Sequence, residues 1–87
     1  MTTQKNNFTA EIIEVIDTVV ISNTQEIRTL LVRDERLGLR VSCQKWWRES
    51  TDDEWKAGKG FFLNGREAVD IGVALQKVGN RIIHIKG

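Results

Sequence analysis

The residues of this chain best suited to chemistry are its three tryptophans and the basic side chains around them. Trp46, Trp47 and Trp55 fall in the stretch WWRESTDDEW, residues 46–55. Flat aromatic rings can stack on unpaired bases while nearby cations bind phosphates, so this combination favours a single-stranded nucleic acid as ligand. The basic residues of the middle third are Arg28, Arg33, Arg36, Arg40, Lys45, Arg48, Lys56 and Lys59.

Signals for catalysis are weak. The sequence has no Gly-rich phosphate loop, nucleophile elbow or metal-ligand spacing. His84, the single histidine, sits inside Ile-Ile-His-Ile, and Cys43, the single cysteine, alternates with Val41, so structural roles are favoured for both. The acidic run 52–54 is typical of a solvated loop. We therefore expect a protein that is not an enzyme and needs no cofactor or metal.

Size and composition constrain the organisation of the chain. With 87 residues it holds at most one domain, expected over residues 8–87 after a disordered segment 1–7. A formal charge of +1 is too balanced to neutralise a duplex backbone wholesale. No apolar run approaches membrane-spanning length, and a lone cysteine fits a reducing compartment, so we expect the cytoplasm of a bacterium or of a viral host and no membrane partner. A core this small makes oligomerisation the expected source of further buried surface.

Hydrophobic patterns predict a β-meander. The β-branched stretches Phe8–Ser22 and Glu26–Arg33 flank a turn at residues 22–25, and the first strand is expected to bend near Asp17. After a polar turn, Leu39–Trp47 alternates as a third strand. A charged loop 48–58 then leads to a fourth strand, Lys59–Leu63.

The period then changes to that of a helix. Asn64 and Glu67 have the spacing of a capping box, and an apolar face follows over residues 65–78. The apolar side spans roughly 220°, more than a surface helix needs, so one part is expected to cover the sheet and another to pair with a second copy through Val69, Gly72, Val73 and Gln76. Gly79-Asn80 is expected to end this helix, and RIIHIK, residues 81–86, to form a short strand. The predicted class is α+β: a curved antiparallel β-meander, one helix and a short C-terminal strand, in a helix-mediated homodimer.

Several fixed spacings resemble one known family. Arg28-Thr-Leu-Leu-Val-Arg33-Asp34 ends thirteen positions before Trp47, and Gly60 of Lys59-Gly-Phe-Phe-Leu-Asn64 follows thirteen positions after it. This pattern, which covers residues 28 to about 78, is similar to the single-stranded-DNA-binding domain of transcriptional positive cofactor four. The added N-terminal strand and the tail suggest a prokaryotic or phage-like branch.

The resemblance implies a homodimer whose paired helices support sheets that bind single-stranded DNA or unpaired duplex. The base-stacking tryptophan of the family falls on Trp47, and its basic residues fall on Arg28, Arg33 and Lys59. Two positions depart from the pattern: Glu35 stands where an aromatic is expected, and Gln44 where an arginine is expected, with Lys45 next to it.

The resulting hypothesis is a dimeric, largely sequence-independent single-stranded-DNA-binding protein acting in transcription, replication or recombination, with proteins of transcription or replication as further candidate partners. Trp47 is expected to stack, and Arg28, Arg33, Lys45 and Lys59 to bind phosphates. Arg36, Arg40 and Trp46 are expected to extend the surface. Because Trp46 and Trp47 are adjacent in a strand, at most one of them can join the core, and alternation alone favours Trp47. The alternatives are a dimeric module that docks a polymerase or recombinase, and a single-stranded-RNA binder.

Overall fold

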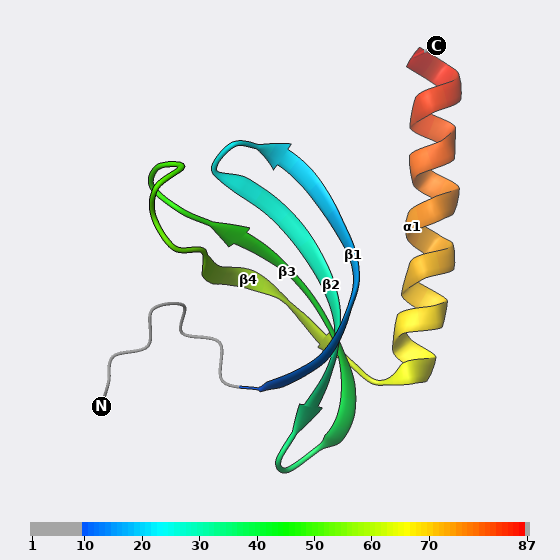
Figure 1. Ribbon diagram of the computed structural model, residues 1–87. Helices are drawn as coiled ribbons and strands as arrows, with labels where there is room; N and C mark the ends of the chain where they lie inside the picture. Colours follow the sequence, from blue (N-terminus) through cyan, green and yellow to red (C-terminus); the bar gives the residue numbers. More distant parts are fainter. Residues whose placement is uncertain (1–9, 87) are drawn as a thin grey trace.

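The computed structural model describes residues 10–86. The chain forms four strands and one helix: β1 (Glu11–Ser22), β2 (Gln25–Asp34), β3 (Gly38–Trp47), β4 (Lys56–Leu63) and α1 (Gly65–Lys86). The strands make one antiparallel sheet in the order β1-β2-β3-β4, strongly curved, with α1 following the last strand (Figure 1). This confirms the predicted α+β class and the meander. The expected disorder of residues 1–7 and the start of the first strand at Phe8 lie outside the described residues.

Local chemistry explains the connections between the strands. In the β2–β3 turn the Asp34 carboxylate accepts hydrogen bonds from the backbone N–H groups of Arg36 and Leu37, at 2.8 and 2.9 Å. Gly38 completes this turn with a φ of 82°, a conformation that costs other residues energy. The register of β1 against β2 shifts between Val15 and Asp17, close to the predicted bend.

The sheet has two different faces, which we name after the adjacent tryptophans. Residues directly opposite one another on paired strands share a face, so the pairs Arg28–Gln44 and Leu30–Ser42 define the Trp46 face. The pairs Thr29–Cys43 and Leu31–Val41 define the Trp47 face. The buried core lies on the Trp46 face and consists of Leu30, Val32, Trp46 and Ala57, with buried Ser42 beside them.

Helix α1 begins as the sequence predicts. The Asn64 side chain accepts a hydrogen bond from the Glu67 N–H at 2.8 Å, and the Glu67 carboxylate accepts one from the Asn64 N–H at 2.9 Å. This is the expected capping box, which satisfies two backbone donors at the start of the helix.

The predicted end of this helix and the strand at residues 81–86 are wrong. The helix continues without interruption to Lys86. A glycine stop needs a left-handed conformation, but Gly38 is the one glycine with positive φ in the described part of the chain, so Gly79 stays helical. A strand also needs a partner to accept its backbone hydrogen bonds, and here the i, i−4 bonds of a helix take that role instead. The isoleucines of the tail therefore extend the apolar surface of α1.

Most of α1 stands away from the sheet (Figure 1). Its large apolar side chains are exposed, from 37% for Ile71 to 75% for Ile85. The radius of gyration, 14.8 Å, exceeds the ~12 Å typical of a compact chain of this length, since the helix does not fold back over the strands. In residues 10–86 no helix is both long and apolar enough to cross a membrane.

Candidate nucleic-acid interface

Three of the predicted binding residues meet in one hollow on the Trp47 face. Lys45 and Trp47 lie at the end of β3, and Lys59 lies beside them on β4. Together with Thr24, Gln25, Arg48 and Gly58 they line an open hollow of about 440 Å³. Trp47 is 37% exposed as a residue, and both lysines are exposed. The site therefore offers an aromatic face flanked by two exposed ammonium groups.

A β-bulge brings Lys59 to this position. The register between β3 and β4 shifts between Gln44 and Trp46, so two residues of β4 face one residue of β3. The glycines on both sides of Lys59 permit the close approach. A Cβ on Gly60 would collide with the Cys43 carbonyl oxygen and the Gln44 Cα, and one on Gly58 would lie 2.9 Å from the Lys45 carbonyl oxygen. The sequence Gly-Lys-Gly thus places a lysine next to Trp47.

Further positive charge surrounds the Trp47 ring. The Lys56 ammonium lies 5.1 Å from the ring centroid, within the range of a cation–π contact. Arg48 is more constrained, because its guanidinium donates to the Asn23 carbonyl at 2.8 and 3.0 Å and covers the Trp55 ring at 4.2 Å. Arg48 thereby connects the loop 48–55 to the β1–β2 turn, while Lys56 adds a further cation beside the Trp47 ring.

Arg28 and Trp46, which were predicted to contact the nucleic acid, lie on the face of the sheet opposite the Trp47 hollow. Both lie on the Trp46 face, and Trp46 is 1% exposed within the core, so its ring is not available to stack on a base. Arg28 pairs with the Glu26 carboxylate at 2.5 Å and lies over the Trp46 ring at 4.3 Å and near the Trp55 ring at 5.4 Å. Arg28 consequently stabilises the packing of the loop 48–55 against the core rather than standing free for a phosphate.

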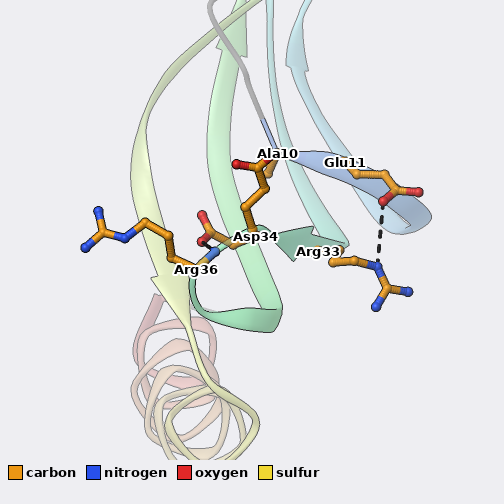
Figure 2. A pocket seen from close by; sticks show the side chains of 6 residues that line it. Ala10, Glu11, Arg33, Asp34 and Arg36 are labelled. Carbon is orange, nitrogen blue, oxygen red and sulfur yellow. Dashed lines mark hydrogen bonds and ion pairs between the residues drawn. The ribbon is translucent and has the colours of Figure 1, made fainter.

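The remaining predicted arginines lie near the opposite end of the sheet. Arg33 forms an exposed ion pair with Glu11 at 3.6 Å, and the Arg36 side chain points the other way, beyond the β2–β3 turn (Figure 2). Both line a second hollow of about 500 Å³, whose other residues include three carboxylates, Glu11, Asp34 and Glu35. Arg40 lies opposite Val32 on the Trp46 face. From Gly38 to Trp47 strand β3 spans roughly 30 Å, so these arginines are remote from the Trp47 hollow.

The carboxyl group of Asp34 has a perturbed pKa. Hydrogen bonds from the backbone N–H of Leu37, then of Arg36, lower this pKa, and the charges of Arg36 and Arg40 act in the same direction. Desolvation of the carboxylate acts in the opposite direction and raises the pKa. The carboxylate is therefore a structural acceptor that holds the β2–β3 turn.

Lys56 and the bulge are the parts of the site that sequence reasoning missed. The fourth strand was expected to start at Lys59, whereas β4 starts at Lys56. The signal was present as Lys-Ala-Gly-Lys-Gly, in which two glycines flank a lysine at a strand position. An isolated glycine in a strand pattern indicates a bulge or a close backbone approach, and both occur here.

The predicted dimer residues lie on one side of α1. Val69, Gly72, Val73 and Gln76 are all exposed, and no heavy atom lies within 4 Å of a Cβ built on Gly72. This side of the helix has room for a close partner.

The chain matches no family model, no curated protein and no solved structure. The functional interpretation accordingly depends on the fold and on the side chains around Trp47.

Proposed function

We propose that this protein binds single-stranded DNA, or unpaired regions of duplex, as a non-enzymatic homodimer of the positive cofactor four type. Such an activity would serve transcription, replication or recombination. The observation that carries the proposal is the exposed ring of Trp47 in a hollow lined by Lys45 and Lys59. An accessible indole flanked by ammonium groups has the two elements needed to bind a flexible single strand. The indole offers a flat surface on which a base can stack, and the ammonium groups can contact a phosphate.

The geometry favours binding with little dependence on sequence. Every base has a π face that can stack on an indole, and lysine interacts with a phosphate as a point charge. The open shape of the hollow also suits a strand that passes over it, since a closed pocket would select a single base. In this proposal Trp47 stacks, and Lys45, Lys59 and Lys56 neutralise phosphates.

A homodimer accounts for the surface of α1. The exposed apolar side chains of this helix would be costly in a monomer, since removal of apolar area from water contributes ~25 cal/mol per Å². Pairing through Val69, Gly72, Val73 and Gln76 would bury one side of it, and would give the complex two Trp47 hollows. Val73→Glu should release monomers in analytical ultracentrifugation, and a wild-type monomer at micromolar concentration would contradict the dimer.

The binding test uses dye-labelled oligonucleotides of one length as single-stranded DNA, single-stranded RNA and duplex DNA. We expect fluorescence anisotropy to rise with the single strands at much lower protein concentration than with the duplex. Trp47→Ala is the site variant, and Arg36→Gln, at the far end of the sheet, is the matched control. Equal binding of wild type and Trp47→Ala, or a preference for duplex, would contradict the proposal.

A further inference from the structure

The Trp47 face of the sheet carries an apolar area that the chain itself leaves half exposed. Beyond the hollow, this face presents the side chains of Ile27, Leu31, Leu39, Val41, Phe61 and Leu63. Phe61 is 60% exposed and Leu39 54% exposed, while Leu31, Val41 and Leu63 are half-buried. A sheet normally buries such a face under a second layer of secondary structure. The missing layer would have to cover β2, β3 and β4 without closing the hollow at the far end of β3.

Helix α1 has an apolar row that is separate from the predicted helix-pairing row. At about 100° per residue, Ile71, Leu75, Val78 and Ile82 lie on one side, well away from Val69 and Val73. Leu75, Val78 and Ile82 are 61%, 51% and 53% exposed, so the chain's own sheet does not cover them. From Ile71 to Ile82 this row is about 17 Å long, comparable with the roughly 13 Å from Leu39 to Cys43 on β3, so it can cover the apolar area without reaching Trp47.

The charges along the edges of these two surfaces are complementary. On β1 the residues Glu14 and Asp17 lie opposite Leu31 and Thr29, so their carboxylates border the apolar area on the Trp47 face. On α1, Arg81 flanks this row at its C-terminal half, about 60° around the helix from Val78 and about 100° from Ile82. A helix laid on the apolar area can therefore set a guanidinium against the acidic border of the sheet.

We propose that the Trp47 face is the docking surface for α1 of a second copy of this chain. The partner's row of Ile71, Leu75, Val78 and Ile82 covers the area around Cys43 and Phe61, and its Arg81 faces Glu14 and Asp17. Each subunit then completes the other's sheet, while the rows containing Val69 and Val73 pair the two helices. The inference rests on the proposed homodimer and specifies which side of each helix contacts which face of each sheet.

The single cysteine of the chain provides the test, because Cys43 lies in the centre of this face. Val78→Cys and Ile82→Cys would each be made with Cys43 present and with Cys43→Ser, and treated with a short bismaleimide cross-linker. We expect a covalent dimer joining Cys43 to the introduced cysteine, identified by peptide mass spectrometry, and its loss in the Cys43→Ser background. Asp70→Cys, on the polar side of α1, is the matched control and should not cross-link to Cys43.

Three results would overturn the inference. A Cys43 link within one chain would show that α1 folds onto its own sheet. A dimer that persists in the Cys43→Ser background would show that the Val78–Ile82 row pairs with its own copy. Absence of any Cys43 link would show that another surface covers the face. Helix pairing is measured separately with Val73→Cys in the Cys43→Ser background, and DNA binding by anisotropy, so either can succeed while this inference fails.

A charge exchange tests the polar border independently. The double variant Glu14→Lys/Asp17→Lys should raise the dissociation constant of the dimer by at least about 2- to 5-fold, as expected for the loss of exposed ion pairs. The single variant Arg81→Glu should raise it by a similar factor. Combining the three substitutions should return it toward the wild-type value. Additive losses in the combined variant would contradict the contact between Arg81 and the acidic border.

Discussion

Trp46 and Trp47 are neighbours in sequence and lie on opposite faces of the sheet, so the same truncation should have opposite consequences at the two positions. Trp46 is 1% exposed in the core, and its ring also supports the Arg28 guanidinium at 4.3 Å. Trp46→Ala removes a buried indole, leaves a cavity and frees a half-buried cation. We expect a loss of about 3–5 kcal/mol in the free energy of unfolding. For a small domain with a total stability of the same order, that loss is enough to unfold much of the population.

Trp47→Ala should cost less stability and more binding. With 37% of the residue exposed, roughly 160 Å² of an aromatic side chain as large as tryptophan is covered. At ~25 cal/mol per Å² the upper limit is about 4 kcal/mol, and because alanine retains part of this area and water can enter the open hollow, about 1–2 kcal/mol is expected. Loss of one stacked base should cost about 1–3 kcal/mol, which weakens binding to single strands about 5- to 150-fold.

The assay compares Trp46→Ala, Trp46→Phe, Trp47→Ala and Trp47→Phe in parallel. Thermal unfolding followed by circular dichroism gives stability, and anisotropy of a labelled oligonucleotide gives affinity without using tryptophan as the probe. Trp47→Phe should retain much of the affinity, since it keeps an aromatic face. A folded Trp46→Ala that has lost binding, together with an unfolded Trp47→Ala, would refute the assignment of the two faces.

Three further predictions concern the bulge, the phosphates and the β2–β3 turn. Gly60→Ala should cost at least about 2 kcal/mol in urea unfolding because its Cβ meets backbone, whereas Gly65→Ala, with nothing within 4 Å, should change stability by under about 0.5 kcal/mol. Lys59→Gln should make the slope of log affinity against log salt concentration less negative by about 0.7, because one phosphate contact is lost. If Arg36→Gln changed the slope equally, Lys59 would not belong to a specific phosphate-binding site. The pKa of Asp34 is lower in the folded than in the unfolded state, so the ionised carboxylate stabilises the fold at pH values above the unfolded pKa. This contribution to the free energy of unfolding is lost as the pH falls through the folded-state pKa. The urea midpoint of wild type should thus exceed that of Asp34→Asn at neutral pH and converge with it below about pH 4, and a constant difference down to pH 2 would contradict this role.

Features set by a few neighbouring residues could be predicted from the sequence. The capping box at Asn64 and Glu67 depends on two side chains and the backbone between them, and it forms as expected. The order of strands in the meander also follows from short turns between β-branched segments. The tail 81–86 shows the limit of such reasoning, since three isoleucines favour a strand only when a sheet edge is available to pair with them.

Features that depend on register and burial could not be predicted in the same way. Alternation correctly separates Trp46 from Trp47, but it favours the wrong face as the core. Leu39, Val41 and Cys43 make the Trp47 face of β3 the more apolar one, whereas the buried core lies on the Trp46 face. Likewise, nothing adjacent to Arg28 indicates that two tryptophans from residues 46–55 will surround it. These outcomes depend on the pairing of β2 with β3 and on the path of the loop.

The distribution of charge explains how a chain with a formal charge of +1 can still present a site for an anion. Several cations have structural partners: Arg28 pairs with Glu26, Arg48 binds the Asn23 carbonyl, and Arg33 pairs with Glu11. The lysines around Trp47 lie apart from the acidic border of β1, and ionic strength screens charges beyond about 8–10 Å. A phosphate in the hollow would therefore meet Lys45 and Lys59, with Lys56 beside the ring, while the carboxylates of the adjoining loop 48–55 would oppose its binding. Local placement of three lysines beside an exposed indole, rather than net charge, is the property on which the proposed binding depends.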